Sequence, residues 1–226
     1  MDVSEVDGKT IVVTGANGRL GRVVCRTFRE QGARPVGIVR TKDMRRQLRS
    51  DDEMPSDVFV ADVTAGHEVD SCFTAIAQQF DTIDGLVHTV GMWTETPLRD
   101  TRLDEWQQVL SVNLTSAWLC FQRAAPLMGE GGRLIGFSSA QGADQGQSKQ
   151  AAYSAAKAGI VRLVEASARE FKEDGITAHA IAPSFIRFDD SDDQPEGVDA
   201  SDIASLCVYL CGPGGNALNG ATIRTY

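Results

Sequence analysis

Apolar and polar positions along the chain alternate between two kinds of segment. Short runs rich in β-branched residues predict strands, and longer segments with apolar residues three and four positions apart predict amphipathic helices. The predicted strands cover residues 10–14, 34–39, 57–60, 85–88, 133–138, 176–182 and 221–224. The predicted helices cover residues 19–31, about 68–80, 103–127, 151–171 and 200–210.

This order of elements predicts an α/β fold. Strands that alternate with helices along a chain form a parallel sheet with helices on both faces, a doubly wound, Rossmann-type arrangement. No linker rich in Pro, Gly or Ser interrupts the alternation, so residues 1–226 are expected to form a single dinucleotide-binding and catalytic domain. Ligands of such sheets bind outside the carboxyl ends of the strands. Functional residues are therefore expected directly after strands.

The first predicted strand runs into a turn that opens the first predicted helix. The turn reads Thr-Gly-Ala-Asn-Gly-Arg-Leu-Gly over residues 14–21. Glycine permits a tight turn and a close approach of the backbone to a pyrophosphate, and the helix N-terminus supplies N–H donors and a positive dipole end. The alternative is a plain turn at a helix start. The candidates for cofactor binding here are Gly15, Asn17, Gly18, Arg19, Leu20 and Gly21.

Residues after the second and third predicted strands bear on the choice of cofactor. An acidic residue after the second strand would bind the ribose hydroxyls of NAD, but this strand is followed by Arg40, with no carboxylate until Asp43. Arg40 can pair with the 2′-phosphate of NADP, and its alternative is a solvated arginine. After the third strand, Asp62 and Val63 are cofactor candidates, and the Asp62 carboxylate either meets the adenine or caps the next helix. NADP is favoured over NAD.

Tyr153 and Lys157 lie four residues apart in an alanine-rich predicted helix and therefore share a helix face. A phenol with a pKa of about 10 is a poor acid or base at neutral pH. An ammonium about 4 Å away, at an effective dielectric constant of about 20, would lower this pKa by up to about three units. Ser138 and Ser139 close the preceding strand, where a hydroxyl can bond to a reacting oxygen. Asn113 lies within a predicted helix despite its poor helix propensity, which favours a role such as holding a water.

The glycine turn and five further residues occur in the order and approximate spacing of the short-chain dehydrogenase/reductase family, and the resemblance covers essentially the whole chain. These residues are Asp62, Asn113, Ser139, Tyr153 and Lys157. The resemblance implies that Tyr153 is the acid/base, and that Lys157 holds the nicotinamide ribose and lowers the Tyr153 pKa. It also implies that Ser139 polarises the substrate oxygen and that Asn113 anchors a relay water.

The same resemblance extends the cofactor site to Gly91 and Pro183. Ser139 is favoured over Ser138 because the segment 140–142 that follows it, Ala-Gln-Gly, is similar to the family's pattern. The implied activity is hydride transfer between NADP(H) and a small carbonyl or alcohol. The resemblance further implies that the long helices 103–127 and 151–171 pair across subunits in a homodimer or homotetramer.

Several positions depart from the family's usual pattern. Arg19 stands where glycine is usual, His88 begins a His-Thr-Val-Gly segment in place of Asn-Asn-Ala-Gly, and Phe188 stands near the place of a threonine. His88 is favoured as a structural histidine over a base. The segment 183–202 is short for the family. Its acidic residues predict a solvated loop: Asp189, Asp190, Asp192 and Asp193.

The substrate side is expected to be apolar, with Ser139 meeting the substrate oxygen. The candidates for its wall are Met92, Trp93, Phe185 and Phe188, although aromatic residues after strands also serve packing. The substrate could resemble that of the ketoacyl-thioester reductases. Two other functions compete. One is a cofactor-binding sensor or scaffold with little turnover, which the altered turn and Phe188 keep open but the intact catalytic candidates oppose. The other is a dihydropteridine-type reductase, which the compact length and the short 183–202 segment suggest.

Charge and cysteine content narrow the classes of partner. The net charge of -9 disfavours nucleic acid, whose phosphates need a basic surface. The sequence contains neither an apolar run long enough for a membrane span nor a signal peptide, so a cytoplasmic protein is expected. The five cysteines fall within apolar stretches. Cys207 and Cys211 are four apart, but no histidine has ligand spacing, so core thiols are expected and no metal.

Overall fold

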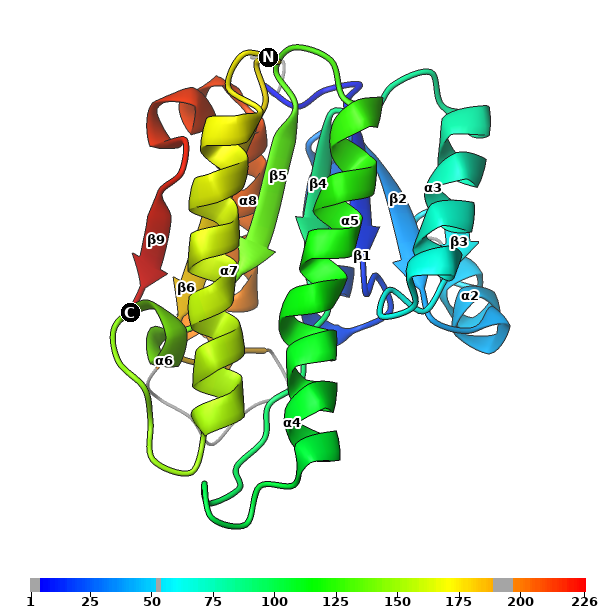
Figure 1. The fold of residues 1–226 in the computed structure, drawn as a ribbon. Coiled ribbons are helices and arrows are strands. Elements are labelled where there is room, and N and C mark those ends of the chain that lie inside the picture. Colours follow the sequence, from blue (N-terminus) through cyan, green and yellow to red (C-terminus); the bar gives the residue numbers. More distant parts are fainter. Residues whose placement is uncertain (1–4, 52–53, 189–196) are drawn as a thin grey trace.

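A computed structural model of the chain describes residues 5–51, 54–188 and 197–226 (Figure 1). Seven strands form one parallel sheet in the order β3-β2-β1-β4-β5-β6-β9. The strands are β1 (Thr10–Thr14), β2 (Arg34–Val39), β3 (Asp57–Val60), β4 (Gly85–His88), β5 (Arg133–Phe137), β6 (Thr177–Pro183) and β9 (Thr222–Thr225). The strand order reverses between β1 and β4, and such a switch point opens a crevice at the carboxyl ends of the strands.

Helices cover both faces of this sheet. They are α1 (Arg19–Glu30), α2 (Lys42–Arg49), α3 (Gly66–Gln79), α4 (Leu103–Leu110), α5 (Ser116–Ala124), α6 (Ala140–Ala143), α7 (Ala151–Glu170) and α8 (Ala200–Cys211). In Figure 1, α3, α5 and α7 lie in front of the sheet and α8 lies behind it. Apolar side chains of α3, α5 and α7 form one buried core with the sheet, and those of α1 and α8 form another. The predicted doubly wound α/β fold is confirmed.

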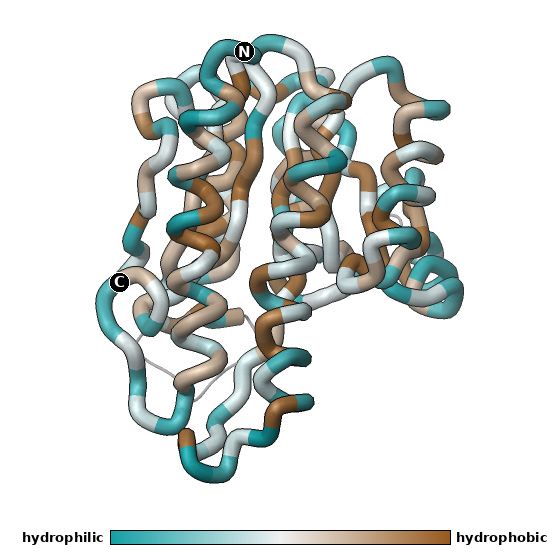
Figure 2. Tube along the Cα trace, in the orientation of Figure 1, coloured by the Kyte–Doolittle hydropathy of each residue, from teal (hydrophilic) through white to brown (hydrophobic). Residues whose placement is uncertain are grey.

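The hydropathy pattern explains why the strands were predicted with little error. β1, β2, β4 and β5 are buried along almost their whole length, so each is a nearly continuous apolar run. Figure 2 shows hydrophobic stretches through the middle of the molecule and hydrophilic positions at its loops. The bounds of β1 to β4 agree with the prediction, β5 ends one residue earlier than predicted, and β6 and β9 are each shifted by one residue toward the C-terminus.

Four short elements were not predicted. α2 is polar, with Leu48 as its buried residue, so it carries no apolar periodicity. α6 is a single turn, and β7 (Ile186–Arg187) and β8 (Val198–Asp199) form a separate two-stranded parallel sheet. The predicted helix 103–127 is continuous, but a π-helical turn (Ser111–Thr115) joins α4 to α5 and a 3-10 turn (Ala125–Leu127) ends it.

All five cysteines are buried and none forms a disulfide, which confirms the expected core thiols. No helix within the described ranges is long and apolar enough to cross a membrane. The acidic residues for which a solvated loop was predicted lie outside the described residues: Asp189, Asp190, Asp192 and Asp193.

Candidate active site

Two adjoining cavities lie at the carboxyl ends of the strands. One, of about 410 Å³, is lined by the glycine turn and by the segments that follow β2 and β3. The other, of about 580 Å³, is lined by the segments that follow β4, β5 and β6 and by the start of α7. Both include Thr89, Gly91 and Met92. The cavities therefore form one cleft that crosses the switch point of the sheet.

The glycine turn needs glycine at two positions. Gly15 has a φ of +68°, which L side chains rarely adopt, and a Cβ at Gly21 would lie 2.2 Å from the Gly15 carbonyl oxygen. Gly18 precedes the first residue of α1 and makes no side-chain cap, so the N–H groups of the first helical turn face the cleft without a capping side chain. This is the geometry that binds a phosphate at a helix N-terminus.

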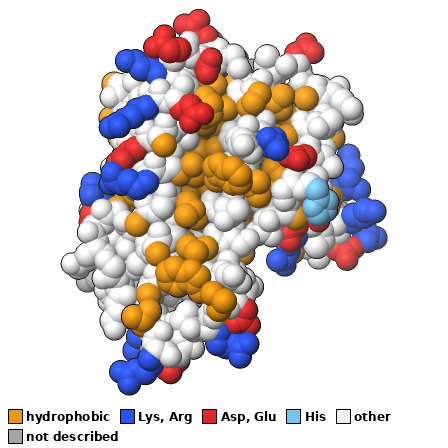
Figure 3. Space-filling model, viewed as in Figure 1, with side chains coloured by type: hydrophobic (Ala, Val, Ile, Leu, Met, Phe, Trp, Pro, Cys, Tyr) orange, Lys and Arg blue, Asp and Glu red, His pale blue; other side chains and the backbone are white. Residues whose placement is uncertain are grey.

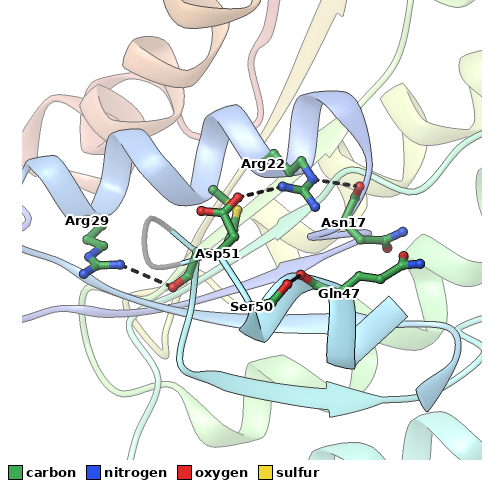
Figure 4. A network of polar contacts seen from close by, with 7 residues as sticks. Asn17, Arg22, Arg29, Gln47, Ser50 and Asp51 are labelled. Carbon is green, nitrogen blue, oxygen red and sulfur yellow. Dashed lines mark hydrogen bonds and ion pairs between the residues drawn. The ribbon is translucent and has the colours of Figure 1, made fainter. Parts of the chain in front are cut away.

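A polar network ties this turn to the segment that follows α2 (Figure 4). Arg22 donates from Nε to the Asn17 carbonyl oxygen at 3.4 Å and pairs through Nη1 with Asp51 at 3.0 Å. Two helical turns further along α1, Arg29 donates to the Met54 carbonyl oxygen at 3.3 Å. Two arginines of α1 thus fix the glycine turn and the segment after α2 relative to each other, and no sequence motif indicated this network.

The smaller cavity places Arg40 and Asp62 together. Asp62 accepts hydrogen bonds from the Thr64 hydroxyl (2.7 Å) and N–H (3.0 Å), and these bonds, with a weaker attraction to Arg40, hold the Asp62 pKa below its usual value. Asp62 does not cap α3, because the N-cap position belongs to Ala65. Val63 lines the same cavity. A carboxylate and an exposed guanidinium therefore face the place expected for an adenosine ribose.

The two serines after β5 have different surroundings. Ser138 donates its hydroxyl to the Lys157 carbonyl oxygen at 2.8 Å, so this group is used in packing. The Ser139 hydroxyl is buried and makes no hydrogen bond of standard geometry to any described residue. Both serines line the larger cavity together with Tyr153. The Ser139 hydroxyl lies beside the Tyr153 phenol and is not used in packing, so it is the one that can bond to a bound oxygen.

Tyr153 and Lys157 line the larger cavity from one face of α7, as their spacing predicted. The predicted lowering of the Tyr153 pKa is wrong: burial raises it, and the neighbouring Ser139 only partly opposes this. The reason is that Lys157 Nζ lies 5.7 Å from the centre of the phenol ring and donates to the Phe137 carbonyl oxygen at 2.9 Å. Burial also lowers the pKa of Lys157 to about 8.

Asn113 lies in the π-helical turn and is buried. Its amide donates to the carbonyl oxygens of Met92 (2.9 Å) and Val109 (3.0 Å), and its oxygen accepts from the Met92 N–H (3.1 Å). Both amide donors are therefore used in fixing the segment after β4. A Cβ at Gly91 would lie 3.0 Å from the Asn113 oxygen and 3.4 Å from Lys157 Nζ, so Gly91 lets these groups approach. A relay water at Asn113 stays a prediction.

α6 packs tightly on α7 at the lysine. A Cβ at Gly142 would lie 2.4 Å from the backbone carbon of Lys157, and a Cβ at Gly159 would lie 2.6 Å from Leu114. α7 is thereby held between the helix that follows Ser139 and the π-helical turn. The position of the lysine depends on these two close contacts.

His88 is a structural histidine, as the sequence favoured. It is buried, with Nδ1 2.9 Å from the Thr14 hydroxyl and Nε2 3.0 Å from the Ser116 hydroxyl. Burial lowers its pKa to about 3, so it is neutral at physiological pH. The ring joins the ends of β1 and β4 to α5.

The remaining candidates divide between the cleft and its rim. The larger cavity is lined by Leu20, Met92, Trp93, Pro183 and Phe185, among others. Trp93 and Phe185 are 59% and 42% exposed, so the cavity opens to solvent beside them. Phe188 is not among the described residues that line the larger cavity. Its ring packs instead against the Arg19 guanidinium, 4.0 Å from the ring centre.

Several residues of the cleft were missed by sequence reasoning. Gln141 and Gln150 line the larger cavity. Their closeness in the chain to Ser139 and Tyr153 was a signal that could have identified them. No sequence signal indicated Lys149, next to the cleft, because its φ of 61° is known only from the structure. Its carbonyl accepts from the Thr96 N–H at 2.7 Å, and its ammonium lies 3.5 Å from Glu95. Lys149 thereby fastens the loop after β4 to the start of α7.

Comparison with known proteins gives a consistent picture. A family model described as enoyl-(acyl carrier protein) reductase matches residues 15–225. Curated relatives include 3-oxoacyl-(acyl-carrier-protein) reductase FabG of Salmonella typhimurium, 28% identical, and of Staphylococcus epidermidis, 30% identical, each match covering 96% of both chains. The FabG protein of Vibrio cholerae is 30% identical over 97% of this chain and 96% of its own.

Solved structures share the fold. A dehydrogenase/reductase from Sinorhizobium meliloti superimposes with a TM-score of 0.89 at 24% identity, covering 99% of this chain and 96% of that one. A short-chain dehydrogenase/reductase from Serratia marcescens gives a TM-score of 0.88 at 22% identity and covers 97% of both chains.

Proposed function

Because the chain belongs to the short-chain dehydrogenase/reductase family of oxidoreductases, we propose that it is an NADP(H)-preferring enzyme acting on a small carbonyl or alcohol. One observation carries this proposal: the buried Ser139 hydroxyl and the Tyr153 phenol line one cavity, with the Lys157 ammonium beside the phenol. That cavity joins a second one bordered by a glycine turn at a helix N-terminus.

The residues of the cleft fit a dinucleotide. The uncapped first turn of α1 suits a pyrophosphate, and Asp62 suits the adenine side. Arg40 suits a 2′-phosphate, as does the N-terminus of α2, which begins at Lys42. Gly91, Pro183 and Lys157 border the end of the cleft where a nicotinamide would lie. When bound, the nicotinamide supplies or accepts the hydride.

The residues of the larger cavity would handle the proton. With a raised pKa, the Tyr153 phenol is protonated at neutral pH and is suited to give its proton to a carbonyl oxygen that is becoming an alkoxide. Ser139 would donate a hydrogen bond to the same oxygen as negative charge develops there. The Lys157 ammonium, 5.7 Å from the ring centre, would stabilise the phenolate that remains. This arrangement favours the reductive direction.

The substrate is proposed to be a small carbonyl compound with an apolar part. Met92, Trp93 and Phe185 give the cavity an apolar side, while the oxygen of Gln150 is buried there without a partner among the described residues. Relatives with 28% and 30% identity are named 3-oxoacyl-(acyl-carrier-protein) reductase, which supports 3-oxoacyl thioesters as the first candidates to test. The net charge of -9 argues against an acidic carrier protein as the thioester's attachment.

We also propose a cytoplasmic homodimer or homotetramer. Trp118 on α5 is 46% exposed, and Figure 3 shows hydrophobic side chains gathered over the face on which α5 and α7 lie. Apolar patches of this kind mark protein contacts. Light scattering coupled to gel filtration tests this: Trp118→Glu should lower the measured mass to that of the monomer, and a wild-type monomer would refute it.

The test of function follows the absorbance of NADPH and NADH with a panel of ketones, quinonoid compounds and 3-oxoacyl-CoA thioesters. We expect turnover with NADPH, and Tyr153→Phe should abolish it while cofactor binding persists. Arg40→Asp should weaken NADPH binding more than NADH binding; equal effects would refute the role of Arg40.

A cofactor-binding sensor with little turnover is the second candidate, because the Lys157 ammonium is turned to the Phe137 carbonyl oxygen. Cofactor binding without turnover on any compound would favour it.

A further inference from the structure

Two positions at which the sequence departs from the family's pattern lie against each other. Arg19, where glycine is usual, is the first residue of α1, and Phe188 follows β7. The guanidinium carbon of Arg19 lies 4.0 Å from the centre of the Phe188 ring. This is well inside the range of about 6 Å over which a cation is attracted to an aromatic face. The two departures therefore form one feature, the Arg19–Phe188 pair.

The backbone that leads to Phe188 is fixed by the small sheet. β7 pairs with β8, and the Val198 N–H donates to the Phe185 carbonyl oxygen at 2.9 Å. Arg187 makes an ion pair with Asp199 at 2.9 Å. Because the strand before it is anchored in this way, Phe188 presents its ring to α1 from a defined position.

Arg19 lies in the chain between two residues that line the cleft. Its neighbour Gly18 lines the smaller cavity and its neighbour Leu20 lines the larger one, while neither Arg19 nor Phe188 lines either. The first turn of α1 carries no acidic residue. Stacking uses the flat face of a guanidinium, and its N–H donors point outward in the plane of that face. The pair therefore holds a cation at the rim, beside the N–H groups of the first turn.

We propose that Phe188 positions the Arg19 guanidinium to bind the pyrophosphate of the dinucleotide, with Phe188 as a positioning residue and Arg19 as the binding residue. This rests on the proposed function. The pyrophosphate is common to both cofactors, so the pair contributes equally to the binding of NADPH and NADH, whereas Arg40 separates the two.

The experiment titrates NADPH and NADH fluorescence with the wild-type protein and four variants at two salt concentrations. The variants are Arg19→Ala, Phe188→Leu, Phe188→Tyr and the double variant Arg19→Ala/Phe188→Leu. Arg40→Ala serves as the control for a residue that acts on one cofactor only. Thermal unfolding of each variant shows that the fold is intact.

Arg19→Ala is expected to weaken the binding of both cofactors roughly tenfold and to make Kd less dependent on salt. Phe188→Leu should weaken both about threefold, Phe188→Tyr should restore affinity because it keeps the aromatic face, and Phe188→Leu should add nothing once Arg19 is Ala. Binding by the wild type with no loss in Arg19→Ala would overturn this inference alone. An equal loss from Phe188→Leu in both backgrounds would also overturn it. A wild-type protein that binds neither cofactor would overturn the proposed function and this inference with it.

Discussion

Ser138 and Ser139 are neighbours in the chain, but the structure gives their hydroxyl groups different tasks. The Ser138 hydroxyl bonds to the Lys157 carbonyl oxygen inside the core, and the Ser139 hydroxyl is buried without a standard hydrogen bond to the described residues. Replacement of each serine by alanine should therefore affect a different property of the protein. We expect Ser138→Ala to reduce stability and Ser139→Ala to reduce turnover.

The size of each effect follows from the contacts. One buried hydrogen bond contributes about 1 kcal/mol, so Ser138→Ala should lower the free energy of unfolding by about that amount. For a chain of 226 residues this corresponds to a fall in Tm of about 2–4 °C. Ser139→Ala removes a buried polar atom that has no partner among the described residues, so its Tm should stay the same or rise. Loss of a donor to a developing oxyanion should lower kcat about 10²–10³-fold.

Two measurements on the same preparations decide the matter. Thermal unfolding by circular dichroism gives Tm, and initial rates of NADPH oxidation give kcat and KM with the best substrate of the panel. NADPH titration serves as the control, and we expect an unchanged cofactor affinity in both variants. If Ser138→Ala loses as much turnover as Ser139→Ala while its Tm stays at the wild-type value, the assignment of the two hydroxyls is wrong.

Three further predictions concern His88, Arg133 and Gly142. Burial lowers the pKa of His88 to about 3, so below about pH 6.5 the unfolded chain binds a proton that the folded chain excludes. This histidine should therefore reduce the free energy of unfolding by up to about 1.4 kcal/mol for each pH unit below 6.5. Urea denaturation at several pH values should show a smaller loss for His88→Asn than for the wild type. Arg133 donates to carbonyl oxygens at the end of α8. Arg133→Met should lower the free energy of unfolding, measured in urea, by about 2–4 kcal/mol, and Arg133→Lys should lower it by less. Gly142→Ala should push α6 from Lys157 and reduce turnover at least tenfold, whereas Gly146→Ala, whose Cβ would meet nothing closer than 3.9 Å, should leave the rate unchanged; equal rates for the two would contradict the packing argument.

The fold could be predicted because its information is local. The central strands of the large sheet are buried on both faces and form apolar runs, and each long helix has one apolar stripe. The position of the site followed from the same information, since residues at the carboxyl ends of parallel strands must meet. For this reason Gly15, Asp62, Ser139 and Tyr153 line one cleft as expected.

What could not be predicted depends on contacts between distant segments. α2 is anchored by Leu48 and by the network around Asp51, neither of which leaves a periodic pattern. The sequence identified Arg19 and Phe188 as separate departures, but only the structure brings them together. The same holds for Asn113: poor helix propensity indicated a special role, yet its partner, the backbone of Met92, belongs to another segment.

The pKa of Tyr153 shows how far the spacing of two residues can predict their chemistry. Four residues of helix put the phenol and the ammonium on one face, but the ammonium lowers the phenol pKa strongly only at a separation of about 4 Å. In the structure, the Lys157 ammonium donates a hydrogen bond to the Phe137 carbonyl oxygen at the end of β5, and burial raises the pKa of the Tyr153 phenol. A phenol in this condition holds its proton at neutral pH. The reduction of a carbonyl needs a proton donor, whereas the oxidation of an alcohol needs the phenolate as a base. The hydrogen bond that the sequence could not reveal therefore leaves Tyr153 in its acid form in the ligand-free protein.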